Sequence, residues 1–207
     1  MHKGKFITFE GAEGSGKSTQ IERAYNYLKR KKKSVIFLRE PGGVAISEEI
    51  RNMLLDVKNK KMIHSSEMLL YMAARAQLVE EVIVPFLKKG KIILCDRFLD
   101  STLVYQGYGH RMNLKLIKDI GRFVTQGIKP DLTLLFDIDV RQGLARIKRA
   151  KDRIERRSLD YHNRVRRGYL SLARQEPGRI RLIKGNKNKE DVWQVVQRHL
   201  DRALKIK

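Results

Sequence analysis

Residues 11–18 have the composition and spacing of a loop that binds phosphate groups. The segment Gly11–Ser18 fits the pattern G-x-x-x-x-G-K-[ST] and follows Phe6–Phe9, which are β-branched or aromatic as in a buried strand. Glycines let backbone N–H groups turn inward around an anion, Lys17 brings positive charge to the β- and γ-phosphates, and Ser18 can bind Mg²⁺. A helix that begins here points its positive end at the same anion. The pattern predicts a nucleoside triphosphate site.

Two further charged segments follow apolar runs and are candidates for a second phosphate site. Asp96 and Arg97 come directly after the run 92–95, and Arg39 follows the run 34–38. An aspartate at a strand end can reach the Mg²⁺ shell beside the phosphate loop, and arginine can bind phosphate oxygens through two N–H groups. Two phosphate sites at one edge of a sheet favour transfer between two nucleotides over simple hydrolysis.

A base-binding pair and a basic segment are the remaining candidates. Tyr71 and Arg75 lie four residues apart in a segment of helical pattern, so a ring and a guanidinium on one face can hold a nucleobase. Arg149 and Arg153 belong to a basic segment, approximately 149–157, that has no apolar face. We expect this segment to be a mobile flap that closes over the γ-phosphate and expels water.

The elements that must position these residues alternate between strands and helices. The predicted strands are 6–9, 34–38, 91–95, 131–136 and 179–184. The predicted helices cover 17–32, 45–55, 66–87, a segment from 101 that breaks near 107–109, 114–125, 140–149, 158–174 and 190–205. This order predicts an α/β protein with a five-stranded parallel sheet covered by helices on both faces. The loops after the strands then meet at one edge of the sheet.

Composition and charge narrow the class of protein. The 207 residues suit one domain, and 45 lysines and arginines against 23 acidic residues give a net charge of +22, which favours anionic partners. The basic run 29–33 contains no aromatic residue for base stacking, so we do not expect nucleic acid as a specific partner. The sequence has no apolar run long enough to span a bilayer, and we expect no membrane association. The single cysteine, Cys95, is predicted to be a core residue in a cytoplasmic protein.

As a set, these segments resemble bacterial thymidylate kinases, a family of nucleoside monophosphate kinases. The similar segments, in family order, are Phe9–Gln20, Arg39–Gly43, Tyr71–Gln77, Asp96–Gly107, Pro130–Asp137, Asp152–Glu155 and Asp160–Leu170. The resemblance implies the three-layer P-loop NTPase fold with a short basic lid, in one kinase domain spanning 1–207 with the lid at approximately 149–157. It also implies transfer of the γ-phosphoryl group of ATP to dTMP, giving dTDP for dTTP synthesis, with Mg²⁺ as cofactor and a homodimeric assembly.

The resemblance also implies a role for each candidate residue. The implied ATP-binding residues are Gly11, Ala12, Glu13, Gly14, Ser15, Gly16, Lys17, Ser18 and Thr19, and the implied Mg²⁺ ligands are Ser18 and Asp96. The implied dTMP-binding residues are Glu13, Arg39, Tyr71, Arg75, Arg97, Thr102, Tyr105 and Gln106. The implied catalytic residues are Lys17, Asp96, Arg149 and Arg153.

Among the implied dTMP-binding residues, the resemblance assigns different residues to the phosphate, the base and the sugar. Arg39 and Arg97 would hold the acceptor phosphate. Tyr71 would stack on thymine at a position where phenylalanine is usual, and Arg75 would bond the base edge with Thr102 and Gln106 nearby. Tyr105 would lie against the sugar, and Glu13 near its 3′-hydroxyl.

The phosphate loop of this chain contains no arginine, and the resemblance relates this absence to the type of lid. Some family members carry an arginine inside the loop, where this chain has Ala12, Glu13 and Ser15. The family compensates with arginines in the lid, and the segment Asp152–Glu155 resembles that lid type. Arg153 is therefore expected to be the arginine at the transition state, with Arg149 as the second candidate.

Three other interpretations remain open at this point. The first is another nucleotide or deoxynucleoside kinase on the same sheet, although Arg39 and Arg97 favour a monophosphate acceptor. The second is a nucleic-acid-binding ATPase, which the +22 charge motivates and which predicts ATP hydrolysis stimulated by DNA or RNA. The third is a degenerate kinase-like regulatory protein, against which Lys17 and Asp96 argue.

Overall fold

The computed structural model describes residues 4–206, and its centre is one sheet of five parallel strands. The strands are β1 (Lys5–Gly11), β2 (Val35–Arg39), β3 (Ile92–Asp96), β4 (Leu132–Asp137) and β5 (Ile180–Lys184). Their order across the sheet is β2-β3-β1-β4-β5. The predicted five-stranded parallel sheet is confirmed.

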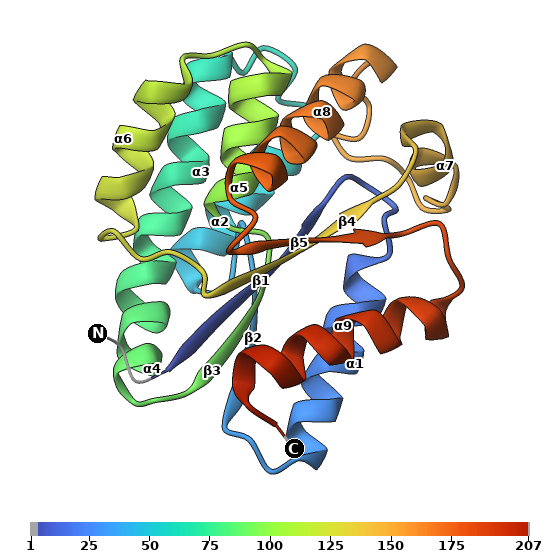
Figure 1. Cartoon of the computed structure of the whole chain (residues 1–207). Coiled ribbons are helices and arrows are strands. Elements are labelled where there is room, and N and C mark those ends of the chain that lie inside the picture. The colour runs from blue at the N-terminus through green and yellow to red at the C-terminus, as the bar shows by residue number, and fades with distance from the viewer. Residues whose placement is uncertain (1–3, 207) are drawn as a thin grey trace.

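Helices cover both faces of the sheet, as Figure 1 shows. On one side, α1 (Lys17–Arg30) and α9 (Lys189–Leu204) lie together. The other side holds α2 (Ala45–Leu55), α3 (His64–Leu78), α4 (Val84–Lys88), α5 (Leu99–Thr102), α6 (Leu114–Val124), α8 (Leu159–Gln175) and two π-helical segments, η1 (Val79–Ile83) and η2 (Leu103–Gly109). The short helix α7 (Val140–Ala145) follows β4. The result is the expected three-layer arrangement.

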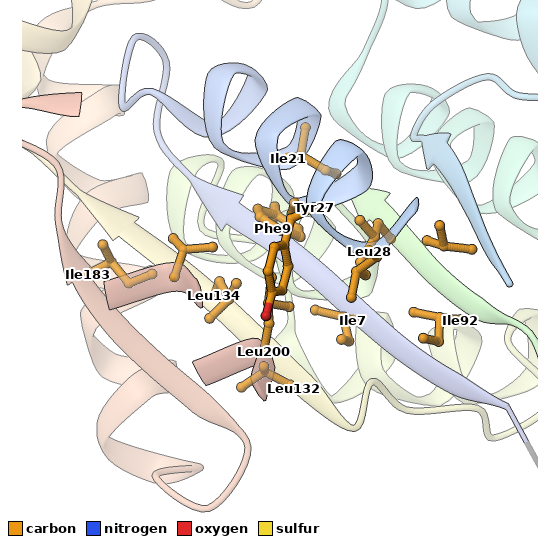
Figure 2. Close-up of a cluster of buried hydrophobic side chains, with 14 of the residues drawn as sticks. Ile7, Phe9, Ile21, Tyr27, Leu28, Ile92, Leu132, Leu134, Ile183 and Leu200 are labelled. Carbon is orange, nitrogen blue, oxygen red and sulfur yellow. The ribbon is translucent and has the colours of Figure 1, made fainter. Parts of the chain in front are cut away.

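Side chains alternate across β1, so each face of the sheet has its own core. Ile7 and Phe9 point toward α1, where Leu28 lies in the same cluster (Figure 2). Phe6 faces the opposite side and packs edge to face on Phe98, with 4.8 Å between the ring centroids. Complete burial of side chains of this size stabilises the fold by roughly 1.5–3 kcal/mol each.

Cys95 belongs to the second of these cores. It lies in β3, is fully buried and is a free cysteine. Burial raises the pKa of its thiol well above the ordinary value. The prediction that Cys95 is a core residue is confirmed.

The carboxyl ends of the strands bring the predicted site segments to one edge of the sheet. In the register of the sheet, Phe9 of β1 lies opposite Asp96 of β3, and Asp96 lies opposite Arg39 of β2. On its other side, β1 places Gly11 opposite Phe136 of β4. The loops that follow β1, β2 and β3 are therefore neighbours at this edge.

The helix predicted over 66–87 follows one path but changes its hydrogen bonding. Here α3 ends at Leu78, and η1 separates it from α4. Pro85 lies in the first turn of α4 and has no N–H to donate to the carbonyl four residues earlier. This missing bond favours the wider π-helical turn that precedes it.

Two other predicted helices also differ from the structure. The break expected near 107–109 is the end of η2, where a Cβ added to Gly109 would lie 2.6 Å from Tyr161 Cε2 on α8. Glycine at this position therefore lets α8 approach closely. The helix predicted over 140–149 ends already at Ala145, and an irregular segment follows. Within residues 4–206, none of the helices is both long and apolar enough to cross a membrane.

Candidate active site

The loop between β1 and α1 has a backbone that only glycine accommodates at key positions. Gly14 and Gly16 have φ angles of 66° and 93°, in the left-handed region. A Cβ on Gly14 would lie 1.9 Å from the carbonyl oxygen of Gly143, so a larger residue would displace α7. The hydroxyl of Ser15 is buried and has no hydrogen-bond partner within residues 4–206. This geometry is that of a loop shaped around an anion.

Lys17 is buried at the end of this loop, with its ammonium group directed at two loop carbonyls. Its Nζ donates to Gly11 O at 3.1 Å and to Ala12 O at 3.3 Å. Burial, together with the positive charge of Arg97, lowers the pKa of Lys17 to about 8. An anion beside the ammonium group would favour its charged form, so this position is suited to a phosphate.

A cavity of about 540 Å³ joins the phosphate loop to the region between α3 and β3. The predicted site residues that line it are Glu13, Gly14, Lys17, Ser18, Tyr71, Arg75, Asp96, Arg97, Thr102, Tyr105, Gln106 and Arg149. Predicted residues outside the lining are of two kinds. Gly11, Ala12, Ser15, Gly16 and Thr19 belong to the phosphate loop and the first turn of α1, whereas Arg39 and Arg153 lie elsewhere.

Arg97 is held at the cavity by its backbone conformation and by polar contacts. Its φ of 72° lies in the left-handed region, which non-glycine residues rarely adopt. Its Nη1 donates to Gly11 O at 3.1 Å and to Tyr169 Oη at 3.1 Å. Its Nη2 forms an ion pair with Glu13 Oε1 at 3.2 Å. Such strain persists where the surroundings fix it and is typical of functional sites.

Asp96 and Ser18, which both carry side-chain oxygen atoms, line the same cavity. Asp96 Oδ1 is buried and has no hydrogen-bond partner in the described part of the chain, and Ser18 is exposed at the start of α1. A carboxylate and a hydroxyl suit Mg²⁺, which takes its other ligands from phosphates and water. Residues 4–206 contain no group of three or more His, Cys, Asp or Glu side chains arranged to hold a metal by themselves. The residues present therefore fit a metal that binds together with a nucleotide.

Glu13 connects the phosphate loop to a cluster of aromatic residues. Its Oε1 accepts a hydrogen bond from Tyr105 Oη at 2.5 Å, and its Oε2 lies 3.4 Å from Nδ1 of the buried His162. Burial would raise the pKa of Glu13, but the proximity of His162 and the charge of Arg97 lower it to about 2. Glu13 is therefore a carboxylate at neutral pH, and it lines the cavity.

Arg75 is fixed in the wall opposite the phosphate loop. It is almost fully buried; its Nε donates to Glu40 Oε2 at 2.7 Å and its Nη1 to Thr102 Oγ1 at 2.9 Å. Tyr71, one helical turn earlier on α3, and Gln106 of η2 line the same wall. Glu40 was not among the predicted site residues. Its role depends on its contact with Arg75, which is 35 positions away in the sequence, and no local pattern indicates that contact.

Arg39 lies at the predicted edge of the sheet, but it is outside the cavity lining. Its side chain is exposed at the end of β2, and its Nη2 donates to both carboxylate oxygens of Glu48, at 3.0 and 2.8 Å. This pairing with α2 keeps Arg39 at the surface and outside the cavity lining. The predicted contact between Arg39 and the acceptor phosphate therefore does not fit this arrangement.

Arg51 of α2 lines the cavity instead, although it was not among the predicted site residues. Its Nη1 donates to Pro41 O at 2.8 Å. The sequence holds a usable signal, since Arg51 lies on the same helical face as Ser47 and Leu54, which are both buried. A charged residue on a buried face has to meet a partner or a polar cavity.

The segment 146–157, which includes most of the predicted lid, lines one side of the cavity and contains neither helix nor strand. Arg149 lines the cavity and pairs with Glu155 through hydrogen bonds of 2.9 and 2.7 Å. Arg146 and Lys148 also line it, and Arg146 Nη1 donates to Gly14 O at 3.2 Å. Neither residue was among the predicted site residues, and the helix predicted over 140–149, which covered both, ends at Ala145.

Arg153 is turned away from the cavity, contrary to expectation. Its Nη1 lies 2.5 Å from Glu67 Oε2, and its Nε donates to Leu54 O at 2.8 Å. The Arg153 side chain is nearly buried in these contacts. A role for Arg153 beside the transferred phosphoryl group does not fit this position, in which it joins the segment 146–157 to α2 and α3. Arg149 is the predicted lid arginine that the structure places at the cavity.

Comparison with known proteins agrees with this geometry. The thymidylate kinase family model matches residues 9–196. The chain is 45% identical over 202 residues to the thymidylate kinase of Kosmotoga olearia, covering 97% of each chain. It is 50% identical over 191 residues to that of Geobacter sulfurreducens, covering 88% of this chain and 90% of the relative.

A solved structure extends the similarity to three dimensions. The crystal structure of thymidylate kinase from Ehrlichia chaffeensis superposes with a TM-score of 0.79 at 33% identity, covering 95% of this chain and 98% of that one. The predicted fold, enzyme class and reaction are confirmed by these matches. The chain belongs to the thymidylate kinase family, whose members phosphorylate dTMP to dTDP with ATP.

Proposed function

We propose that the chain moves the γ-phosphoryl group of ATP to dTMP directly and in line, within the cavity at the carboxyl ends of the strands. The main support for the proposal is that a single cavity extends from the phosphate loop to α3. Lys17 and Ser18 line it on the phosphate-loop side, and Tyr71 and Arg75 line it on the α3 side. Two nucleotides can therefore meet in one space with their reacting groups aligned, which is the main requirement for phosphoryl transfer.

On the donor side, we assign the loop Gly11–Thr19 to the phosphates of ATP. The backbone N–H groups of the loop and the N-terminus of α1 favour an anion, and Lys17 offsets charge on the transferred group. Asp96 and Ser18 would hold Mg²⁺; the unpartnered buried oxygen of Asp96 supports this assignment. When bound, Mg²⁺ supplies positive charge at the β- and γ-phosphates.

On the acceptor side, we assign Arg97 and Arg51 to the phosphate of dTMP. Both line the cavity, and each is fixed by a backbone carbonyl: Gly11 O for Arg97 and Pro41 O for Arg51. Planar guanidinium groups held in this way can bind phosphate oxygens in pairs. Arg39 is left out of this assignment because it is exposed and lies outside the cavity lining.

The nucleoside would lie between α3 and η2. We assign Tyr71, Arg75, Thr102 and Gln106 to the thymine base, and Glu13 and Tyr105 to the sugar. The contacts that fix Arg75 before binding reduce the ordering cost of recognising the base edge. The ring of Tyr71 supplies a stacking surface.

We assign the segment 149–157 as the lid of a single kinase domain over 1–207. Arg149 is exposed, and in the described part of the chain it is paired only with groups of the lid itself, Glu155 and Ala150 O. If a γ-phosphate replaced Glu155 as its partner, Arg149 would stabilise the charge of the passing phosphoryl group. Arg153 acts in this proposal as the anchor of the lid.

A panel of nucleoside monophosphates in a coupled ADP-release assay tests the proposed reaction. We expect dTMP to give the highest kcat/KM, and dUMP to be used less well by a factor of about 10–200, the value of one methyl group in a pocket. The assay is repeated with added DNA or RNA, which should leave the rate unchanged. ADP release that needs nucleic acid and not dTMP would contradict the proposal and favour a nucleic-acid-dependent ATPase.

We also propose a homodimer formed through α3 and α6. These helices lie side by side in Figure 1 and expose Leu69, Leu116 and Phe123, of which Phe123 is 82% exposed. Grouped exposed apolar side chains are typical of interfaces. Light scattering after gel filtration should give twice the chain mass for the native protein and the monomer mass for Phe123→Glu. A native monomer at micromolar concentration would contradict this assembly.

We further propose that the chain works in the cytoplasm. Cys95 is a free, fully buried thiol, as suits a reducing compartment. The reaction also consumes ATP, which the cytoplasm supplies. Cell fractionation should recover the chain with cytoplasmic markers, and recovery with membranes would contradict this location.

A further inference from the structure

Glu67 is a buried carboxylate that the reaction as assigned above does not use. It lies in the first turn of α3, and its side chain has no exposed surface. Its Oε1 is 2.9 Å from Gln106 Nε2 and 3.0 Å from His110 Nε2. Its Oε2 is 2.5 Å from Arg153 Nη1 and 3.0 Å from Arg157 Nη2.

The four donors come from two segments that are far apart in the sequence. Gln106 and His110 lie in η2 and at its C-terminal end, whereas Arg153 and Arg157 lie in the lid segment. A buried carboxylate is stable only when it is paired and hydrogen-bonded, so Glu67 holds both segments to α3. Burial would raise the pKa of Glu67, but the hydrogen bonds from His110 and Gln106 and the charge of Arg153 lower it to about 2.

Each of these segments also forms part of the cavity wall. Gln106 lines the side assigned to the thymine base. Asp152 and Ile154, the two neighbours of Arg153, line the lid side. Arg153 itself is fixed further by its bond to Leu54 O at 2.8 Å. One carboxylate thus joins the acceptor wall of the cavity to its lid wall without lining the cavity itself.

We propose that Glu67 is a positioning residue that couples occupancy of the acceptor pocket to the position of the lid. The inference rests on the proposed function, because it takes the wall around Gln106 as the dTMP site. A nucleotide that draws Gln106 toward the base changes the bonds that remain for Arg153 and Arg157 on the same carboxylate. The lid then responds to dTMP through hydrogen bonds rather than through direct contact.

Limited digestion with trypsin reports the position of the lid, since seven of the twelve residues 146–157 are lysine or arginine. We expect dTMP to slow cleavage of this segment in the native enzyme. In Glu67→Gln, we expect faster cleavage in the absence of dTMP and loss of protection by dTMP. Calorimetric titration should show that dTMP still binds to this variant, with a dissociation constant within about threefold of the native value.

Steady-state kinetics give a second measurement. A variant that is only less stable, but still folded, should keep the native kcat and KM. In Glu67→Gln, weaker hydrogen bonds from Arg153 and Arg157 should lower kcat by about 10- to 100-fold and leave the KM for dTMP nearly unchanged. The matched control is Asp100→Asn, which removes another buried carboxylate, paired with Arg179 at 2.7 Å and outside the cavity lining. This control should lower the melting temperature but keep both kcat and the protection by dTMP.

Two results distinguish failure of this inference from failure of the proposed function. A native enzyme that is inactive with dTMP would overturn the proposed function. An active native enzyme whose Glu67→Gln variant retains protection and kcat would overturn the coupling role alone. If Glu67→Gln does not fold, Arg157→Gln replaces it, because this side chain is 23% exposed and leaves Arg153 on the carboxylate. That variant should lose part of the protection, and full retention would count against the inference.

Discussion

Separate replacement of Arg51 and Arg39 by alanine tests where the acceptor phosphate binds. The sequence pattern favours Arg39, at the end of a strand, whereas the structure places Arg51 in the cavity lining and Arg39 outside it. The two residues lie within one short stretch of chain, so the variants are matched in chemistry and in region. They differ in whether the guanidinium faces the cavity.

The expected magnitudes follow from the surroundings of each side chain. Arg39 and Glu48 are 48% and 38% exposed, and exposed ion pairs of this kind contribute about 0–1 kcal/mol. Arg39→Ala should therefore change kcat/KM for dTMP by less than about fivefold. Arg51 would make charge-assisted hydrogen bonds to the phosphate, worth about 1.5–3 kcal/mol, so Arg51→Ala should lower kcat/KM by about 10- to 100-fold.

The coupled ADP-release assay, with dTMP varied at saturating ATP, measures this difference. The KM for ATP is the internal control and should remain nearly constant in both variants. Thermal unfolding checks that each variant is folded. A larger loss in Arg39→Ala than in Arg51→Ala would refute the structural assignment and restore the one drawn from the strand-end pattern.

Three further predictions concern the phosphate loop and Glu67. Lys17→Met should lower kcat by about 10²–10³ while the protein remains folded, as measured in single-turnover reactions and by circular dichroism. Gly14→Ala should lower the free energy of unfolding by more than about 1 kcal/mol in urea titrations, because the native φ of 66° and the 1.9 Å approach to Gly143 O exclude a Cβ. The pKa of Glu67 is lowered from 4.5 to about 2 in the folded chain, so its stabilisation is complete above pH 4.5 and is lost as the pH falls toward 2. The advantage of the native protein over Glu67→Gln should therefore shrink by about 3 kcal/mol across that range in urea titrations.

The sheet and the phosphate loop were predictable because their signals are local. Phe6–Phe9 are apolar or β-branched in consecutive positions, and the glycine and lysine spacing that follows specifies a backbone conformation rather than a distant contact. Alternating strands and helices then determine which loops share an edge. The residues 92–95 and the adjoining Asp96 and Arg97 were correctly placed at that edge for the same reason.

Arg39 and Arg153 could not be placed from the sequence, because their directions depend on distant partners. The strand-end pattern locates the backbone of Arg39 at the correct edge, but Glu48 determines where its side chain points. The lid segment has no apolar periodicity, so nothing local shows that Arg153 turns inward to Glu67, 86 residues earlier. Arg51, by contrast, could have been predicted from the sequence, because it lies on the same helical face as the buried residues of α2.

In the proposed reaction, one cavity holds both nucleotides with their phosphates facing each other. Steady-state inhibition by a compound that joins adenosine and thymidine 5′ to 5′ through a chain of phosphates tests it most directly. If both nucleotides share the cavity, this compound should compete with ATP and also with dTMP. Competition with ATP alone, with the KM for dTMP unaffected, would contradict it.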